Sequence, residues 1–572
     1  MPDLATYRAG VGAAPDEMLA WPLHGTGLES LGRGGRPELI PTPQPGPREL
    51  LCRVDAAGLC FSDIKILTLG SKHPRISGRD LSRDPVIMGH EAALTVVAVG
   101  AELQQQYHLG DRFVVQADII YRGQGLAFGY ALPGALAQFT RIGAEILEGD
   151  EGRYIIPIEP DTGYAEAALS EPWACVERSY RTTHRTSFRQ GGTALLGAAA
   201  GADTGAVVLG ELASGPWPAR LVLAGLSGVS QFGAQARSWQ AEGELEEHDA
   251  LTPALFEGRQ FADIVLIGNV EPEVIEAASA ALDKGGILCL VRSDPLPRPV
   301  RVDVGRIHYD DVHYLGTTSS DLSTGYRSRA SDLKPGGKAW FLGAGGPMGQ
   351  MHVQRASEDP DGPSLIVASD VDADRLGTIP ERYGAAAQQN AIELVCLDPN
   401  ALGPEAFNGR LTSLAREGFD DVVCLAPVPA LIPGALARVG RDGVLNLFAG
   451  LARGTVVELD LTPVFQRGVR LIGTSGSAIS DLEFTLRKTE RGQLSPNRSV
   501  AAIGGMRAAR DGLEAVQKGR FAGKVVIYPQ IPDLALTRLE DLAAVLPDVA
   551  AHLAEGAVWT REAELALIEH YL

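Results

Sequence analysis

A thiol, an imidazole and a carboxylate are spaced along the first third of the chain in a way that could form a metal site. His90 follows Cys60 by 30 residues, and Glu171 comes later, at the end of a β-rich region. One thiolate, one imidazole and one carboxylate make a three-ligand zinc site with an open fourth position, as in catalytic zinc centres. Each residue alone is weak evidence, because single Cys and His residues commonly serve packing. We therefore predict one zinc ion, bound by Cys60, His90 and Glu171.

A second chemical pattern is a glycine-rich turn between a strand and a helix. The apolar run 339–342 leads into the turn 343–349, a helical run follows, and a second strand over 365–369 ends at Asp370. Glycines let a pyrophosphate approach the backbone at a helix N-terminus, and the acid accepts hydrogen bonds from ribose hydroxyls. The predicted cofactor-binding residues are Gly343, Gly345, Gly346, Pro347, Met348, Gly349 and Asp370.

The spacing and the charge of this turn bear on which cofactor would bind. Asp370 follows Gly349 by 21 residues, close to the expected separation of about 20. Met348 stands where the strict glycine pattern has glycine, so a turn without a ligand is the alternative. Because the Asp370 carboxylate would repel a 2′-phosphate, the sequence favours NAD.

The predicted secondary structure that positions these residues changes along the chain, from mostly strands to alternating strands and helices. Up to about residue 165, short β-branched runs such as 93–99 and 112–115 are separated by turn residues. From about residue 190, apolar runs alternate with helical stretches, which is typical of a parallel sheet. The expected fold class is α/β, with a β-rich catalytic domain and two Rossmann-like doubly wound parallel-sheet repeats. The expected domains are 1–185 (zinc), 190–320 (degenerate repeat), 336–475 (NAD), 476–530 (return segment) and 531–572 (helical extension).

The two repeats are inferred from matching strings at nearly the same offset. Phe261-Ala262-Asp263-Ile264-Val265 matches Phe419-Asp420-Asp421-Val422-Val423, which lies 158 residues later, and Leu315-Gly316-Thr317 matches Ile472-Gly473-Thr474. In the first repeat, Asp203 stands where the second has Gly349 and Gly225 stands where it has Asp370. We therefore expect the first repeat to serve structure rather than to bind a nucleotide.

Composition narrows the class of partner. The chain has 572 residues and a net charge of −20, which makes nucleic acid an unlikely partner. No apolar run approaches the roughly 18 residues of a spanning helix, and the N-terminus has no signal-peptide pattern. Six scattered cysteines indicate a reducing compartment, so we expect a cytoplasmic protein with a small-molecule substrate and no membrane partner.

Four strings together resemble the zinc-dependent medium-chain dehydrogenase/reductase family. They are Gly58-Leu59-Cys60-Phe61-Ser62-Asp63, Gly89-His90-Glu91, Glu171-Pro172 and the C-terminal Gly523-Lys524-Val525-Val526-Ile527. A carboxylate at 171, the turn before Gly349 and the tail from Trp559 to Glu564 look similar to its polyol and sorbose-1-phosphate reductase-like branch.

The resemblance implies that the β-rich domain is a GroES-like catalytic domain, and it implies a role for each residue around the metal. Cys60, His90 and Glu171 would be zinc ligands, and Glu91 would sit beside the metal or exchange onto it. Ser62 would relay the proton from the substrate hydroxyl, and Asp63 would hold the His90 ring by its other nitrogen. The implied function is zinc- and NAD-dependent interconversion of a secondary alcohol (a polyol, sugar or sugar phosphate) and its ketone.

Three departures from the family pattern stand out. Residues 92–174 contain no cysteine, so a second, structural zinc is not expected. Lys65 occupies the position of a relay histidine, which leaves the proton exit route open. The extra repeat makes the chain longer than a common member. Two alternatives therefore stay open: a metal-free reductase of the same fold, and a nucleotide-sensing protein without turnover.

The duplicated repeat allows two arrangements. Either it packs elsewhere as an appended domain, or the two repeats pair through their last strands, near 312–315 and 469–472, within one chain. In the second case the first repeat would replace a partner subunit, since an exposed sheet edge must be paired or covered. The chain would then be a monomeric pseudo-dimer; otherwise it would be a homo-oligomer.

Overall fold

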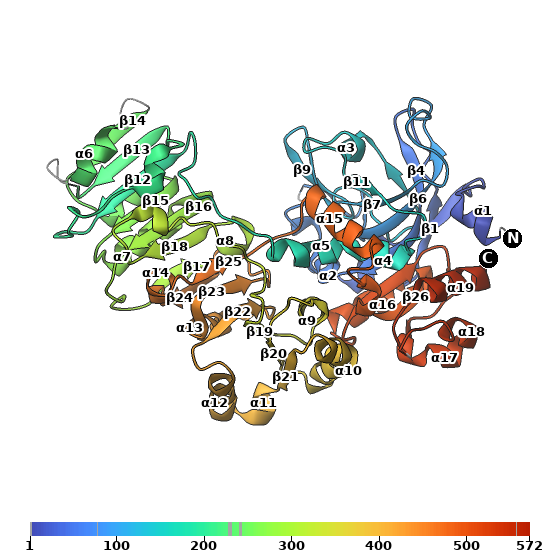
Figure 1. The fold of residues 1–572 in the computed structure, drawn as a ribbon. Helices are drawn as coiled ribbons and strands as arrows, with labels where there is room; N and C mark the ends of the chain where they lie inside the picture. The colour runs from blue at the N-terminus through green and yellow to red at the C-terminus, as the bar shows by residue number, and fades with distance from the viewer. Residues whose placement is uncertain (1–2, 77, 227–230, 239–242, 556) are drawn as a thin grey trace. The chain divides into compact units, whose positions relative to one another are not determined.

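The computed structural model describes residues 3–76, 78–226, 231–238, 243–555 and 557–572, and Figure 1 labels its elements. The chain folds into two compact units. The first comprises Met1–Glu177, Gly346–Met351 and Gly476–Leu572, and the second comprises Arg178–Gly345 and His352–Ser475. The predicted α/β fold class is confirmed, whereas the division into five domains stays a prediction.

The first unit is built around one eight-stranded sheet. Its order is β11-β7-β6-β4-β27-β26-β28, with β10 paired to β4. Every residue of β4 is buried, as its nearly unbroken run of apolar and small side chains requires. The strands are β4 (Leu50–Leu59), β6 (Glu91–Val99), β7 (Arg112–Val115), β10 (Phe139–Ile142), β11 (Ile155–Pro157), β26 (Val500–Gly505), β27 (Lys524–Tyr528) and β28 (Thr537–Arg538).

Three small two-stranded sheets and several helices complete the first unit. The small sheets pair β1 (Glu17–Ala20) with β3 (Glu38–Pro41), β2 (Pro22–Leu23) with β5 (Val86–Ile87), and β8 (Asp118–Tyr121) with β9 (Gln124–Ala127). Its helices include α1 (Leu4–Arg8), α2 (Phe61–Leu69), α3 (Ala144–Leu147), α4 (Tyr164–Ala168), α5 (Ser170–Ser179), α15 (Ile479–Glu490), α16 (Ala509–Gln517), α17 (Leu542–Val545), α18 (Pro547–Ala550) and α19 (Arg561–Tyr571). The segment after residue 531 thus contains β28 and the helices α17, α18 and α19.

One buried carboxylate of the tail helix α19 bonds to the rest of the first unit. Glu564 accepts hydrogen bonds from the backbone N–H groups of Tyr164 and Ala165, at the start of α4. It also accepts a hydrogen bond from the Tyr528 hydroxyl at 2.8 Å. A carboxylate at a helix N-terminus satisfies donors that have no partner within the helix. This contact explains structurally why an acidic residue stands in the tail.

The second unit holds a twelve-stranded sheet with the order β14-β13-β12-β15-β16-β18-β25-β23-β22-β19-β20-β21. Six strands come from the first repeat: β12 (Thr193–Ala198), β13 (Arg220–Ala224), β14 (Glu244–His248), β15 (Phe261–Ile267), β16 (Leu282–Val291) and β18 (His313–Thr317). Six come from the second: β19 (Lys338–Leu342), β20 (Leu365–Ser369), β21 (Glu393–Leu397), β22 (Phe419–Cys424), β23 (Val439–Leu447) and β25 (Arg470–Ile472). Within each half all pairs are parallel, as in doubly wound folds.

The two halves of this sheet repeat one topology in mirrored order, as the matching strings predicted. β12 corresponds to β19, β13 to β20, β14 to β21, β15 to β22, β16 to β23 and β18 to β25. The helices of this unit include α6 (Gln231–Arg237), α7 (Pro272–Ala280), α8 (Val304–Tyr309), α10 (Ala373–Gln389), α11 (Pro399–Leu402), α12 (Pro404–Leu414), α13 (Ile432–Ala437) and α14 (Thr462–Gln466). Helix α9 (Pro347–Glu358) follows β19, and only its later residues, from His352, cluster with this unit.

The repeats meet at the strands that the sequence singled out. β18 and β25 lie antiparallel, with Tyr314 opposite Leu471. A second antiparallel pair joins β17 (Val300–Asp303) to β24 (Val456–Leu459), again one strand from each repeat. The pairing through the last strands is therefore confirmed, and the alternative of an appended domain that packs elsewhere is wrong.

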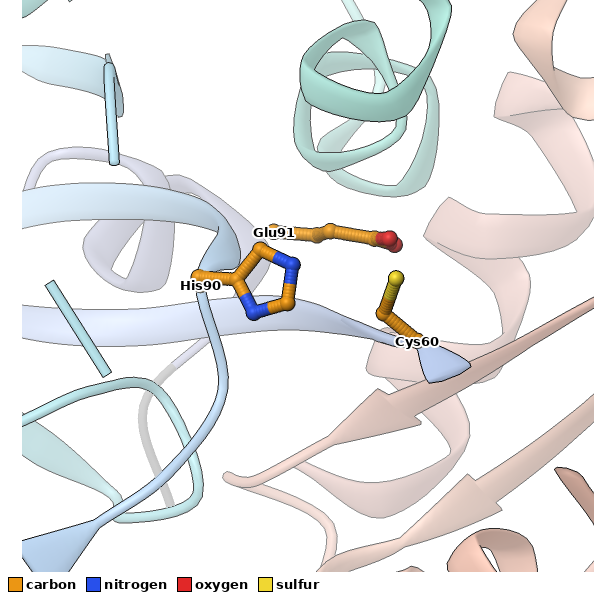
Figure 2. Close-up of side chains that lie close together, drawn as sticks. All are labelled: Cys60, His90 and Glu91. Atoms are coloured by element: carbon orange, nitrogen blue, oxygen red, sulfur yellow. The ribbon is translucent and has the colours of Figure 1, made fainter. Parts of the chain in front are cut away.

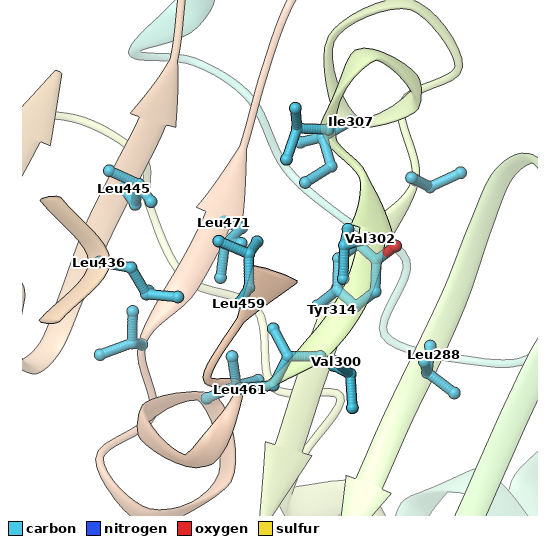
Figure 3. Close-up of a cluster of buried hydrophobic side chains, with 14 of the residues drawn as sticks. Leu288, Val300, Val302, Ile307, Tyr314, Leu436, Leu445, Leu459, Leu461 and Leu471 are labelled. Carbon is cyan, nitrogen blue, oxygen red and sulfur yellow. The ribbon is translucent and has the colours of Figure 1, made fainter. Parts of the chain in front are cut away.

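One apolar core runs across this junction. Val300, Val302 and Tyr314 of the first repeat belong to the same buried cluster as Leu459 and Leu471 of the second, and Figure 3 shows these side chains gathered between the strands. Because burial is continuous where β18 meets β25, neither strand faces water there. Each strand therefore covers the edge of the other repeat. In the part of the chain that the structure describes, no helix is both long and apolar enough to cross a membrane.

Candidate active site

Two neighbouring strands of the first unit bring two of the three predicted metal ligands, Cys60 and His90, close to Glu91. β4 ends at Leu59, so Cys60 lies just beyond it at the start of α2, while His90 and Glu91 stand at the beginning of β6. Gly58 pairs with Glu91 across the two strands. A Cβ atom at position 58 would lie 2.0 Å from Glu91 Oε2, so any other residue there would displace the Glu91 carboxylate.

The ligand atoms of Cys60, His90 and Glu91 lie within 4.8 Å of one another. Figure 2 shows the Cys60 sulfur, a ring nitrogen of His90 and the Glu91 carboxylate pointing toward one another. His90 is 5 % exposed and Glu91 fully buried, whereas Cys60 is half-buried. The group is therefore accessible from the side of the Cys60 thiol.

The donor set of this group fits a zinc ion. Sulfur, imidazole nitrogen and carboxylate oxygen are the ligand types of catalytic zinc. The second oxygen of Glu91, Oε2, is buried and has no hydrogen-bond partner in the described structure. A buried carboxylate oxygen without a partner carries a large desolvation cost, which a cation would remove.

Asp63 lies where the resemblance placed it. Its Oδ1 is 3.3 Å from His90 Nδ1, while its Oδ2 accepts a hydrogen bond from the backbone N–H of Cys60 at 2.9 Å. The contact with His90 falls short of hydrogen-bond geometry, and His90 Nδ1 has no hydrogen-bond partner in the described structure. Burial opposes the charged imidazolium, yet Tyr130 and Asp63 together raise the pKa of His90. Asp63 therefore orients two of the three ligands at once.

Glu171, the third predicted ligand, does not belong to this close group. It lies in the first turn of α5, is 9 % exposed and interacts electrostatically with His90 and Glu91. Burial raises the pKa of Glu171 to about 7. The structure thus brings Glu91 into the position of third donor, and ligation by Glu171 stays a prediction.

Lys524 is a residue of this site that the sequence analysis did not single out. It begins β27, which lies antiparallel to β4, and its Nζ lies 2.5 Å from Glu91 Oε1. Both side chains are buried, at 4 % and 0 % exposure. Burial alone would lower the pKa of Lys524. Attraction to Glu91 and Cys60 outweighs burial, so the pKa of Lys524 is raised. The sequence held one signal for this residue, namely a lysine at the start of the apolar run Val525–Tyr528. A lysine buried in a strand needs an acidic partner, so the run indicated an ion pair.

The predicted cofactor turn has the expected local geometry. β19 leads through the turn into α9, which begins at Pro347, and β20 ends beside Asp370. Asp370 accepts a hydrogen bond from the Gly345 N–H at 2.8 Å. A Cβ atom on Gly346 would meet nothing within 4 Å, so the backbone is open to a ligand there. Pro347, Met348 and Gly349 form the first turn of α9, where backbone N–H groups favour a phosphate.

The corresponding turn of the first repeat differs. Between β12 and β13 the chain forms only the short 3-10 helix Gly210–Ser214, and Asp203 accepts a hydrogen bond from the Gly205 N–H. A loop without an α-helix offers no N-terminal turn for a pyrophosphate. This geometry agrees with a repeat that serves structure.

Comparison with known proteins adds independent evidence. Residues 46–147 match the family model of the alcohol dehydrogenase GroES-like domain. Mannitol-1-phosphate 5-dehydrogenase of Aliivibrio fischeri is 24 % identical over 91 % of this chain and 92 % of its own length. The L-sorbose 1-phosphate reductase of Klebsiella pneumoniae is 29 % identical over 44 % of this chain and 59 % of its own length.

A solved structure shares the fold. That of 2R,3R-butanediol dehydrogenase from Bacillus subtilis aligns with a TM-score of 0.52 and 14 % identity, covering 90 % of this chain and 99 % of the other. The chain therefore contains an alcohol dehydrogenase GroES-like domain and is similar to zinc-type medium-chain dehydrogenases/reductases. This alcohol dehydrogenase-like chain is thus an oxidoreductase of the alcohol and polyol dehydrogenase type.

Proposed function

We propose that this dehydrogenase interconverts a secondary alcohol, namely a polyol, sugar or sugar phosphate, and its ketone, using one zinc ion and NAD. The observation that carries the proposal is the close group of Cys60, His90 and Glu91 with an unpartnered buried carboxylate oxygen. The names of the relatives from Aliivibrio fischeri and Klebsiella pneumoniae support a polyol or sugar substrate.

The chain's own residues have separable tasks in this proposal. Cys60, His90 and a carboxylate, Glu91 or Glu171, would hold the metal. When bound, zinc supplies Lewis acidity at the substrate hydroxyl, and the nicotinamide supplies a two-electron acceptor. Ser62, half-buried in the first turn of α2, would take the hydroxyl proton. Asp63 holds the His90 ring, and Lys524 holds the Glu91 carboxylate.

The test is a substrate panel assayed on zinc-loaded protein. We expect reduction of NAD with at least one polyol or sugar phosphate, at a zinc content of about one ion per chain, since one ligand group is present among the described residues. Turnover that is unchanged after zinc removal would favour a metal-free reductase. NAD binding without turnover on any member of the panel would favour a sensing protein.

The same panel, run with NAD and NADP in parallel, tests Asp370. We expect wild-type protein to prefer NAD and Asp370→Ser to narrow that preference, because the variant loses both the ribose contact and the repulsion of a 2′-phosphate. A wild-type preference for NADP would contradict the assignment.

We also propose that the chain is a monomer whose two repeats form a pseudo-dimer. The edge strands β18 and β25 already pair within one chain, so that edge is not available to a second copy. Light scattering coupled to size-exclusion chromatography should give the mass of one 60.5 kDa chain. A dimer that persists on dilution would contradict this prediction. The six unpaired cysteines support a reducing, cytoplasmic setting.

A further inference from the structure

An open cavity of about 590 Å³ lies in the first unit, where the end of α1, the loop 106–111, β7 and the end of β11 meet. Its volume falls within the roughly 300–1,000 Å³ of small-molecule binding sites. Three arginines line it, namely Arg8, Arg112 and Arg153. The charge of these side chains indicates what kind of molecule could bind.

Arg112 is a buried cation that lacks an acidic partner. It is 8 % exposed and forms no ion pair in the described part of the chain. Its guanidinium donates to backbone carbonyls, among them those of Pro160 and Thr162 at 3.1 and 2.8 Å, while its buried Nε has no hydrogen-bond partner there. Glu166 interacts with Arg112 electrostatically and forms its own ion pair with Arg561. Since buried arginines are normally paired, this charge lacks a counter-charge.

A second guanidinium group lies beside that of Arg112. Arg8 Nη2 donates to the same Pro160 carbonyl oxygen, at 2.5 Å. Because one oxygen accepts from both arginines, the two cations are neighbours and repel each other. The Asp161 carboxylate lies 3.9 Å from Arg8, but its side chain is 97 % exposed, so water and salt screen that ion pair. An anion in the cavity would lower the repulsion between the two arginines.

The third arginine adds to the positive charge of the lining. Arg153 is exposed, lies 5.6 Å from the centroid of the Tyr107 ring, and forms no ion pair among the described residues. Asp111, an acidic side chain of the lining, already accepts a hydrogen bond from the backbone N–H of His108 at 2.7 Å. The lining therefore carries an excess of positive charge, although the whole chain has a net charge of −20.

The rest of the cavity wall is largely apolar. Tyr107, Phe113 and Ile158 are 4 %, 6 % and 7 % exposed, and they line the cavity together with Pro157 and Pro160. Such side chains can pack against a carbon skeleton, whereas guanidinium groups form paired hydrogen bonds with carboxylate or phosphate oxygens. The combination favours an organic anion over an inorganic ion.

We propose that this cavity is a binding site for a small organic dianion, whose carboxylate or phosphate groups pair with the three arginines and whose carbon skeleton packs on the apolar wall. The site is separate from the metal group, and it does not depend on the proposed function. Arg112 pairs with Thr95 of β6, four residues after Glu91, so this end of β7 lies about 13 Å along the strand from the metal group.

The test is isothermal titration calorimetry on full-length, zinc-loaded protein with two probes, phthalate and phenyl phosphate, at a pH where both are dianions. We expect at least one probe to bind, with one molecule per chain. Arg8→Met and Arg153→Met should each weaken that binding about tenfold or more, because each removes a charge-assisted hydrogen bond. Arg112 stays unchanged in these variants, since its bonds to backbone carbonyls also support the fold. Tighter binding of phthalate would identify a carboxylate ligand, and tighter binding of phenyl phosphate a phosphate ligand.

Arg122→Met is the matched control. Like Arg153, Arg122 is exposed and lies over a tyrosine ring, 5.0 Å from the centroid of Tyr121, but it does not line the cavity. We expect this variant to bind the probe within twofold of wild type. Thermal unfolding gives an independent readout, because a ligand that binds only the folded chain raises its Tm. The bound probe should raise the Tm of wild type and Arg122→Met more than that of Arg153→Met.

Four results would overturn the site. The first is that neither probe binds wild type at millimolar concentration. The second is wild-type affinity in both Arg8→Met and Arg153→Met, because the anion would then bind elsewhere. The third is an equal loss in Arg122→Met, which would indicate attraction to surface charge in general. The titration is also repeated on zinc-free protein, where we expect the same dissociation constant; a loss of binding there would mean that the anion binds the metal.

Discussion

Replacing His90 with alanine is expected to reduce turnover below detection and to weaken zinc binding at least about a hundredfold. The physical reason is that His90 supplies one of three clustered donors, and loss of even an outer-shell partner costs 10–100-fold in metal affinity. Zinc content by elemental analysis and NAD reduction with the polyol panel measure the two effects. The fold should persist, because the surrounding sheet buries its own apolar core.

Two further variants make this prediction sharper. Asp63→Asn keeps all three donors but weakens the orientation of His90, so it should give an intermediate loss of about 10–100-fold in zinc affinity. Glu171→Gln decides the identity of the third ligand: near-normal zinc content would favour Glu91, and a loss comparable to His90→Ala would favour Glu171. A His90→Ala protein that still holds one zinc per chain would contradict the site.

Replacing Lys524 with methionine should destabilise the first unit by about 3–5 kcal/mol in zinc-free protein. The substitution leaves the Glu91 carboxylate buried without its partner, and an uncompensated buried charge carries a cost of this size. The midpoint of urea unfolding measures the loss. Added zinc should reduce the loss, because the metal would then neutralise the same carboxylate.

The controls for this variant use a surface pair and a double substitution. Lys518 pairs with Glu514 on the exposed side of α16, so Lys518→Met should change stability by less than about 1 kcal/mol. Lys524→Met combined with Glu91→Gln should recover part of the loss, since no buried charge then remains. An effect of Lys524→Met as small as that of Lys518→Met would show that Glu91 is not held in this way.

Several features of this protein follow from the sequence alone, because they depend on neighbours in the chain. The strand, turn and helix around Gly343–Gly349 are set by local apolar runs and glycines, and the structure places β19 and α9 there. The β-branched run 93–99 is set by local sequence in the same way, and the structure has β6 (Glu91–Val99) there. The nearly constant offset between the matching strings indicated the duplication, whereas the pairing of the strands near 314 and 471 was one of two arrangements left open, and the structure has that pairing.

Other features were decided only by the tertiary structure. Lys524 and Glu91 are 433 residues apart, and they meet because β27 and β6 both flank β4. Neither the order of strands in a sheet nor its register can be read from a short motif, since both depend on burial over the whole unit. For the same reason the sequence predicted Glu171 as the third ligand, whereas the fold brings Glu91 closest to Cys60 and His90.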